Sequence, residues 1–261
     1  MYSFGDINNN IVLGDCLQIL PKIEGSVFDL VFLDPPYFME LSGKSLRRWD
    51  GTEAIGVIDQ WDRFNSQEEY DDFLTNLLQE VRRLMKPTAT LWTIGTYHNI
   101  FIMGRHLQDL GFWILNDVIW FKNNPMPNWR RCRFTNATET LIWCVKDRDY
   151  KKYIFNSDYA KQFGLGSNGN NVWRLPVCRG RERIKTTANK KLHSTQKPVG
   201  LLRRILLTST QKGDLVLDPM CGTGTSGFVA KLLGRNYFMI DNNPVYVEAA
   251  KKRLQFSGFE I

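Results

Sequence analysis

Residues 215–227 read LVLDPMCGTGTSG, an apolar run that ends in a carboxylate and opens into a glycine-rich loop. The pattern predicts a buried strand, a G-x-G-x-x-G turn at 222–227, and a helix that begins within TSGFVAKLL. Asp241 ends the next apolar run, NYFMID, where a carboxylate can hydrogen-bond ribose hydroxyls. Strand, loop, helix and acid together predict a site for a dinucleotide or an adenosine compound.

The position of this loop in the chain restricts the fold. Only residues 242–261 follow Asp241, which is enough for one helix. An NAD-binding domain that started at the loop would have two strands and no complete sheet, so the other strands must precede it. We therefore expect a circularly permuted, Rossmann-like α/β fold in a single domain over 1–261.

That fold is supported by seven short apolar runs, most of which are separated by segments whose apolar residues recur with the period of a helix. The clearest helix is predicted over 67–85, with Ser66 as N-cap, Glu69 completing a capping box, and Pro87 beyond its end. Alternation of strands and helices predicts a mostly parallel seven-stranded sheet with helices on both faces. The predicted strands are NNIVLG, FDLVFLD, TATLWTIG, WILNDVIWF, ETLIWCV, DLVLD and NYFMID.

The strand FDLVFLD continues into DPPY at residues 34–37, an ending that suits chemistry on a nucleobase amino group. Such a nitrogen is a poor nucleophile because its lone pair is delocalised into the ring. A carboxylate from Asp34 and a carbonyl from Pro35 could accept its two N–H groups and free the lone pair, while Pro36 stiffens the turn. Tyr37 offers a ring for stacking a base, worth about 1–3 kcal/mol.

Net charge and its distribution indicate a polyanionic partner. The chain carries +7 with a pI of about 9.1, and two segments, 38–65 and 147–192, interrupt the strand–helix alternation. We interpret both as insertions, the second being basic and a candidate target-recognition region. The candidates for DNA contact are Lys44, Arg47, Arg48 and Trp49 in the first and Arg174, Arg179, Arg181 and Arg183 in the second.

Other classes of protein are disfavoured by composition. No run of 18 apolar residues is present, and the first residues, MYSFGDINNN, do not resemble a secretory signal, so we expect a cytoplasmic protein without a membrane span. The five cysteines are scattered and only three histidines occur, which favours free thiols over disulfides or a metal site.

The order of motifs, DPPY first, then HSTQKP at 193–198, then DPMCGTGT, resembles the S-adenosylmethionine-dependent DNA amino-methyltransferases in their permuted beta class. The resemblance covers residues 8–254. It implies that the methyl group of S-adenosylmethionine is transferred directly to a base that has left the duplex. The catalytic positions that it implies are Asp34, Pro35, Pro36 and Tyr37.

The same resemblance implies the cofactor site. The family places the glycine motif around the methionine part, the acid of the next strand on the ribose, LGDCL beside the adenine, and HSTQKP beside the cofactor carboxylate. The implied cofactor-binding residues are Asp15, Cys16, Asp34, His193, Thr195, Gln196, Lys197, Asp218, Pro219, Met220, Cys221, Gly222, Thr223, Gly224, Thr225, Asp241 and Asn242.

A finer resemblance concerns the target. WDRF at 61–64, TYHNIF at 96–101, NDVIWFKNNPMPN at 116–128 and TNATETLIW at 135–143 are similar to the adenine-N6 methyltransferases that act on GANTC sites. Those enzymes usually carry a further C-terminal DNA-binding segment, whereas this sequence ends at Ile261. A second subunit could supply the missing surface, so we expect a homodimer on double-stranded DNA.

Several alternatives stay open. Cytosine-N4 methylation is chemically close, although the family usually has Asp first in the catalytic motif for adenine and Ser for cytosine. Methylation of RNA, and a DNA-binding module without activity, are further possibilities. A cognate restriction endonuclease is compatible with the sequence and not implied by it. Cytosine-C5 methylation is rejected, because it needs an activated cysteine nucleophile and no cysteine has a Pro-Cys context.

Overall fold

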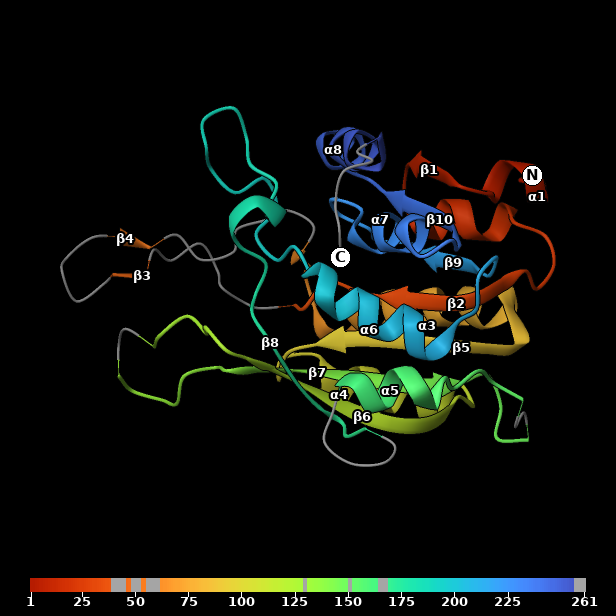
Figure 1. Ribbon diagram of the computed structural model, residues 1–261, viewed down its shortest axis with the longest axis horizontal. Coiled ribbons are helices and arrows are strands. Elements are labelled where there is room, and N and C mark those ends of the chain that lie inside the picture. Colours follow the sequence, from red (N-terminus) through yellow and green to blue (C-terminus); the bar gives the residue numbers. More distant parts are fainter. Residues whose placement is uncertain are drawn as a thin grey trace.

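The computed structural model describes residues 1–38, 46–47, 53–54, 62–128, 131–149, 152–163 and 169–255. One eight-stranded sheet runs through these residues (Figure 1). Its strands, in spatial order, are β1 (Asn10–Leu13), β10 (Asn236–Asp241), β9 (Leu215–Asp218), β2 (Phe28–Leu33), β5 (Met85–Gly95), β7 (Thr138–Val145), β6 (Trp113–Lys122) and β8 (Val172–Leu175). A two-stranded ribbon pairs β3 (Leu46–Arg47) with β4 (Glu53–Ala54).

The sheet is mostly parallel, as expected. Strands β1, β10, β9, β2 and β5 are parallel neighbours, β7 is antiparallel to both β5 and β6, and β8 is parallel to β6. All seven predicted strands are present, so the Rossmann-like α/β fold is confirmed. The predicted number of strands is one too small, because β8 was not recognised.

Strand β8 lies inside 147–192, the segment interpreted as an insertion. Its sequence, VWRL, has four residues and follows a Gly/Asn-rich stretch, so no period could be read from it. Pairing with the edge of β6, from Ile119↔Val172 to Lys122↔Leu175, makes it a strand. The segment is therefore partly built into the sheet and also carries α5 (Ser157–Phe163) and the 3₁₀ turn η3 (Gly180–Glu182).

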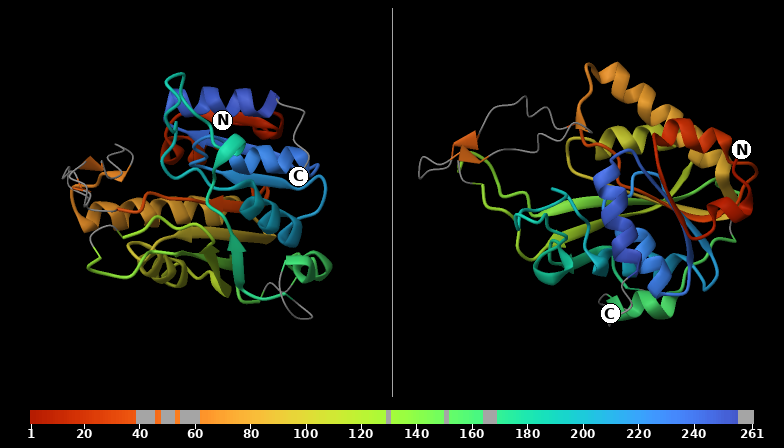
Figure 2. Two further views of the ribbon diagram at one scale, coloured as in Figure 1. Left: turned by 60° about the vertical axis from the view of Figure 1, so that its left-hand side comes forward. Right: turned by 90° about the horizontal axis from the view of Figure 1, so that it is seen from above.

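Helices cover both faces of the sheet (Figure 2). Each face has its own apolar core. On one face lie α1 (Phe4–Ile7), α2 (Cys16–Ile19), the turn η1 (Leu20–Lys22), α3 (Gln67–Leu84) and α4 (Ile100–Asp109). On the other lie α6 (Val199–Ser209), α7 (Thr225–Leu232) and α8 (Pro244–Gln255), with α5 packed against α6. Among the described residues, no helix has the length and apolarity that crossing a bilayer requires.

The alternation of side chains along β2 shows how the sheet divides the two cores. Val31 and Leu33 pack with the α3 side, while Leu30 and Phe32 pack with the α6 side. Because successive side chains of a strand point to opposite faces, an apolar run without polar interruption is required when both faces are covered. The same reason explains LVL in β9 and YFMI in β10.

Helix α3 forms where predicted. The Ser66 hydroxyl accepts the Glu69 amide at 3.1 Å, and the Glu69 carboxylate accepts the Asn65 amide at 2.7 Å. The first bond satisfies an N–H group that the helix start leaves free, and the second ties the residue before the N-cap to the first turn. The helix ends at Leu84, because Met85 is already extended and begins β5.

Strands β2 and β9 are hydrogen-bonded neighbours, with Leu30 opposite Val216 and Val31 opposite Leu217. Parallel neighbours end at the same edge of a sheet, so DPPY after β2 and the glycine loop after β9 meet there despite their separation in sequence. The expected adjacency of the two motifs is confirmed.

Gly224 ends the glycine loop and caps α7 with a left-handed backbone, φ +70°. A Cβ atom there would lie 2.7 Å from the Ala250 Cβ atom of α8. We predict that Gly224→Ala destabilises the fold through both effects, about 1–2 kcal/mol for the backbone and about 1–3 kcal/mol for the clash. Denaturant unfolding measures the sum.

Gly213 provides the matched control, because its φ is +89° and nothing lies within 4 Å of an added Cβ atom. Gly213→Ala should show the backbone cost alone. Equal losses of unfolding free energy in the two variants would contradict the tight packing of the loop against α8.

Candidate active site

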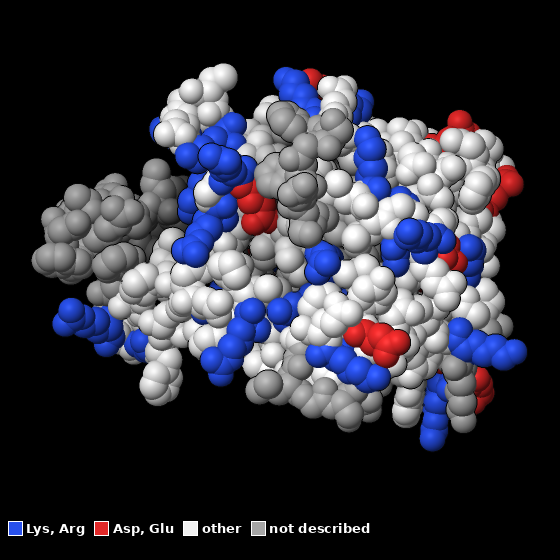
Figure 3. Space-filling model, in the orientation of Figure 1, with Lys and Arg blue, Asp and Glu red and all other residues white. Residues whose placement is uncertain are grey.

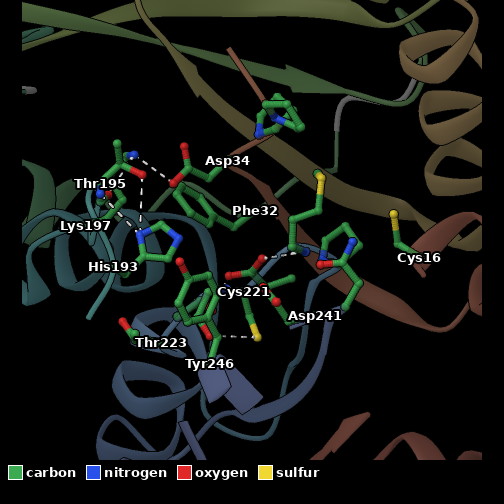
Figure 4. A pocket seen from close by; sticks show the side chains of 18 of the residues that line it. Cys16, Phe32, Asp34, His193, Thr195, Lys197, Cys221, Thr223, Asp241 and Tyr246 are labelled. Atoms are coloured by element: carbon green, nitrogen blue, oxygen red, sulfur yellow. Dashed lines mark hydrogen bonds and ion pairs between the residues drawn. The ribbon is translucent and has the colours of Figure 1, made fainter. Parts of the chain in front are cut away.

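A cavity of about 330 Å³ opens at the carboxyl ends of β2, β9 and β10 and beside the start of α2 (Figure 4). Its size lies in the range of small-molecule sites, about 300–1,000 Å³. The cavity is lined by the following residues that the sequence led us to expect at the cofactor or catalytic site: Asp15, Cys16, Asp34, Pro35, Pro36, His193, Thr195, Gln196, Lys197, Asp218, Pro219, Met220, Cys221, Gly222, Thr223, Thr225, Asp241 and Asn242.

The Asp34 carboxylate follows β2 and is held by two donors. Its Oδ2 atom pairs with the Lys197 ammonium at 2.7 Å, and its Oδ1 atom accepts the Tyr37 hydroxyl at 2.8 Å. The Asp34 side chain is 16% exposed and lies at the cavity. A carboxylate offers about four acceptor positions. Each oxygen therefore keeps capacity for a further donor.

Tyr37 is placed differently from the expectation. Its side chain is buried and its hydroxyl sits between Asp34 and the Lys197 ammonium, which is 2.7 Å away. Burial, with the Asp34 charge adding to it, raises the pKa of the phenol well above its usual range. The ring does not line the cavity, so this structure does not present the stacking face that the sequence suggested.

The turn after β2 is fixed from two sides. The Asp62 carboxylate accepts the backbone amides of Tyr37 and Phe38 at 2.5 and 2.8 Å. The Pro36 carbonyl accepts the Tyr70 hydroxyl at 2.7 Å and the Asn99 amide at 3.4 Å. Both lone pairs of the Pro36 carbonyl are thus engaged. Of the two proline carbonyls, that of Pro35 is therefore favoured to accept a hydrogen bond from a ligand beside the Asp34 carboxylate.

Two acids define the glycine side of the cavity. The Asp241 carboxylate accepts the Gly222 amide at 2.7 Å and the Asn243 amide at 2.9 Å, so it anchors the loop to the end of β10. The Asp218 carboxylate accepts the Met220 amide at 3.2 Å and the Ser226 hydroxyl. Burial raises the pKa of both acids, that of Asp218 to about 7.

Gly224 does not line the cavity, in contrast to the other cofactor candidates of its loop. Its left-handed backbone and its contact with Ala250 give it a structural function at the start of α7. At the opposite wall, Asp15 caps α2 by accepting the Leu17 amide at 2.9 Å. Burial raises the pKa of the neighbouring Cys16 thiol to about 12.

The HSTQKP segment lines the cavity, and several of its side chains also contact other parts of the protein. Gln196 accepts the Ile184 amide at 3.0 Å and donates to the Glu182 carbonyl at 2.9 Å, so it fastens the basic segment to the start of α6. His193 packs edge-on against Tyr246, with ring centres 4.7 Å apart. The Lys197 ammonium, expected beside the cofactor carboxylate, pairs with Asp34 at the cavity wall.

Sequence reasoning missed part of the lining. The additional cavity residues are Gly14, Leu17, Phe32, Arg63, Phe64, Phe73, Leu202, Ser226 and Tyr246. Phe32 could have been found, because it precedes Asp34 by two positions and such residues share a face of a strand. Gly14 lies in the turn after β1, beside the expected Asp15, and the others come from helices and from residues 63–64, whose approach to the cavity depends on packing.

The DNA-contact candidates are dispersed. Arg174, Arg179 and Arg181 are exposed, and the Arg174 guanidinium lies over Phe121. The Arg183 guanidinium is half-buried and donates to the Cys178 carbonyl at 2.9 Å from Nε, a structural contact. Lys44, Arg48 and Trp49 lie outside the described residues, and of Arg47 only its backbone in β3 is described.

No group of three or more His, Cys, Asp or Glu side chains in the described part of the chain is arranged to hold a metal ion. The sequence led us to expect no metal site, and the described residues add no candidate. The cavity acids, Asp218 and Asp241, are instead engaged by backbone amides and a hydroxyl.

An acid-ended strand beside a glycine loop, with both facing one cavity in a mixed α/β sheet, is typical of Rossmann-like proteins that bind a nucleotide-containing cofactor. A family model described as DNA methylase matches residues 28–252. The chain belongs to this family of N6/N4 DNA methyltransferases. It is 47% identical over 253 residues to the Type II methyltransferase M.HinfI of Haemophilus influenzae, covering 97% of this chain and 70% of that protein.

Solved structures share the fold. The M1.HpyAVI–SAM complex has a TM-score of 0.66 with 24% identity, over 95% of this chain and 99% of that one. The PvuII DNA methyltransferase, which is cytosine-N4-specific, has a TM-score of 0.72 with 20% identity, over 97% of this chain and 88% of that one.

The raised pKa of the buried Asp218 carboxyl predicts that the stability of the protein without added cofactor depends on pH. An unfolded Asp has a pKa of about 3.9, whereas the folded carboxyl titrates near 7. The Asp218 carboxyl therefore stays protonated to higher pH in the folded state than in the unfolded state. The stability that comes from this difference in proton binding is complete below pH 4 and is lost as pH rises to 7. We expect wild type to lose about 2–4 kcal/mol relative to Asp218→Asn across that window.

Urea unfolding of both proteins between pH 4 and 8 measures the difference. The exposed Asp109, replaced by Asn, serves as control and should give a curve parallel to wild type. A constant offset between wild type and Asp218→Asn would show that the buried carboxyl does not titrate in this range.

Proposed function

We propose that the protein is a permuted, beta-class DNA adenine-N6 methyltransferase that uses S-adenosylmethionine. The observation that carries the proposal is the Asp34 carboxylate, which lies on the wall of the cavity that also holds the glycine loop and Asp241. A base acceptor and a cofactor acid in one cavity provide the proximity that direct transfer requires.

The cavity suits the proposed cofactor. Asp241 offers a carboxylate for ribose hydroxyls, and the acids Asp218 and Asp15 complement an ammonium group. Phe32, Leu17 and Met220 supply apolar surface for the adenine ring and the sulfonium side chain. When bound, S-adenosylmethionine supplies an electrophilic methyl group whose carbon–sulfur bond breaks as the carbon–nitrogen bond forms.

Asp34 and Pro35 act on the target amino group. The carboxylate and the Pro35 carbonyl accept its two N–H bonds, which withdraws the nitrogen lone pair from the ring. One proton then leaves the nitrogen, and Asp34 or water receives it. The turn is stiffened by Asp62, Tyr70 and Asn99, so the acceptors stay aimed without a covalent enzyme intermediate.

Adenine is favoured over cytosine by residue type and by relationship. Asp occupies the first motif position, and the motifs around Asp62, Asn99 and Glu139 resemble GANTC-specific adenine methyltransferases. The fold itself does not discriminate, because the cytosine-N4-specific PvuII enzyme shares it. We therefore propose GANTC or a closely related short site, with cytosine-N4 methylation as the alternative.

Tyr37 must change its environment if it stacks against the target base. Its ring is now beside the Lys197 ammonium, 5.2 Å from the ring centre. Extrusion of the base from the duplex costs a few kcal/mol. We propose that entry of the base draws Tyr37 away from Lys197, so that stacking offsets part of this cost.

Basic side chains near η3 suit the DNA backbone. In Figure 3, Lys and Arg gather over the segment that carries η3, and Arg179 and Arg181 are exposed there. The 147–192 segment would act as the target-recognition region, with 38–65 as a second insertion contacting DNA. A homodimer in the cytoplasm, acting in a restriction–modification system with or without a cognate endonuclease, completes the proposal.

The primary test replaces Asp34 by Ala. Single-turnover methylation of duplex DNA should fall by at least about 10²–10³, because the acceptor acts on the transition state. Affinity for S-adenosylmethionine should change less than about tenfold, or ~1.4 kcal/mol. Nucleoside mass spectrometry of wild-type product should show N6-methyladenine, and sequencing of methylated DNA should locate the site.

Asp109→Ala is the control for this experiment, since it removes an exposed carboxylate far from the cavity motifs. If the product is N4-methylcytosine, the protein is a cytosine-N4 methyltransferase, which is the alternative given above. Retained turnover in Asp34→Ala would exclude the acceptor function itself.

Phosphate contacts by the η3 segment predict a salt dependence. The logarithm of DNA affinity should fall with the logarithm of salt by about 0.9 for each phosphate neutralised. Arg179→Gln and Arg181→Gln should each flatten this slope by about 0.9, and the double variant by about 2. Arg105→Gln on α4, which lies outside both insertions and removes a charge paired with Asp109, should leave it unchanged.

Fluorescence anisotropy with a labelled duplex over a salt series measures these slopes. Slopes equal to wild type in both arginine variants would place the DNA on another surface.

A further inference from the structure

Behind Asp34, four charged side chains of alternating sign form a line that no motif had suggested. Asp34 follows β2, Lys197 precedes α6, Glu139 belongs to β7 and Lys122 to β6. Lys197 pairs with Asp34 at 2.7 Å and lies 3.9 Å from Glu139, whose other oxygen pairs with Lys122 at 2.8 Å. The line joins the catalytic turn to the antiparallel part of the sheet.

All four side chains are largely removed from solvent. Exposed fractions are 16% for Asp34, 5% for Lys197 and 12% each for Glu139 and Lys122. Buried charges are costly unless each has an opposite partner, and here two carboxylates and two ammonium groups sum to zero. Removing one member therefore leaves a neighbour uncompensated.

Glu139 contributes to this line in an unusual way. Its Oε1 atom is satisfied by Lys122, but its buried Oε2 atom accepts no hydrogen bond from the described residues. What faces Oε2 is the Lys197 ammonium at 3.9 Å, an ion pair without a hydrogen bond. Glu139 thus acts on Lys197 by charge alone.

Lys197 uses its donors elsewhere. Its ammonium lies 2.7 Å from Asp34 Oδ2, 2.7 Å from the Tyr37 hydroxyl and 3.3 Å from the Thr195 carbonyl. An ammonium group has three donors, so these contacts account for all of them. The Glu139 charge adds an attraction from the side of β7, which opposes movement of this group toward the cavity and onto more of the Asp34 carboxylate.

Glu139 is well placed to supply that attraction, because its backbone is rigid. It pairs with Trp120 in the β6–β7 ladder, and Lys122 on the same strand as Trp120 lies over that indole, 5.5 Å from the ring centre. The carboxylate is therefore fixed by the sheet, whereas the turn after β2 and the segment before α6 are not strands.

We propose that Glu139 is a positioning residue for methyl transfer: acting through Lys197, it holds the ammonium on the β7 side of Asp34. The Asp34 oxygens then keep acceptor capacity for the amino group of the target base. The inference rests on the proposed acceptor function of Asp34 and adds a residue that does not line the cavity.

The test is Glu139→Gln, which keeps the shape and removes the charge. The single-turnover rate should fall by about 10- to 100-fold, since misplacement of a reacting group by 1 Å can cost about 10²-fold. Dissociation constants for S-adenosylmethionine and for duplex DNA should stay within about threefold. Glu248→Gln, which breaks the exposed pair with Lys252 on α8, is the matched control and should keep the wild-type rate.

A double-mutant cycle with Lys197→Gln separates positioning from a general structural effect. If Glu139 acts through Lys197, adding Glu139→Gln to Lys197→Gln should change the rate by less than about twofold. Equal losses in both backgrounds, or an unchanged rate in Glu139→Gln, would overturn the proposal.

Glu139→Asp covers the case in which the Gln variant does not fold. It keeps the charge but withdraws it by one methylene group, so the rate should lie between those of wild type and Glu139→Gln, and above background. A wild-type rate in Glu139→Asp would overturn the proposal when the Gln variant is unfolded. Failure of the proposed function is recognised separately, because it appears as a different methylated base, or none, in the wild-type product.

Discussion

The ion pair between Lys197 and Asp34 is the contact on which the arrangement of the site depends. It joins a turn from the first part of the chain to the segment that leads into α6, across a long stretch of sequence. The same ammonium contacts the Tyr37 hydroxyl and faces Glu139, so the positions of four side chains are set together. Because these groups are buried, none of them can lose its partner without a penalty of desolvation.

That pair can form only because the sheet brings its two halves together. Strands β2 and β9 are neighbours, so the turn that carries Asp34 and the loop that carries Gly222 leave the sheet at one edge. Helix α6 packs on the same face as Phe32, which brings Lys197 over the end of β2. The separation of the two motifs along the chain thus does not keep them apart in space, since parallel strands ending side by side place their loops together.

The glycine loop illustrates how the fold uses one motif for two purposes. Gly222 brings its amide to Asp241 and lines the cavity, whereas Gly224 faces α8 and allows the close approach of Ala250. A similar division applies to HSTQKP, in which Thr195 lies at the cavity while Gln196 fastens the backbone of residues 182–184. Within each of these motifs, some residues therefore line the cavity while others support helix packing or the attachment of the basic segment.

The sequence by itself determined the class of fold, seven of the eight strands, and most of the cavity lining. These features are encoded locally: uninterrupted apolar runs mark strands buried on both faces, and a carboxylate or glycine after such a run marks the edge where ligands bind. Only the tertiary structure decided that β8 is a strand, that the Tyr37 ring does not line the cavity, and that Lys197 pairs with Asp34. It also brought Glu139 and Lys122 behind the turn that carries Asp34. The physical reason is that an edge pairing, the direction of a side chain and the partner of a buried charge depend on residues distant in sequence, which local periodicity does not report.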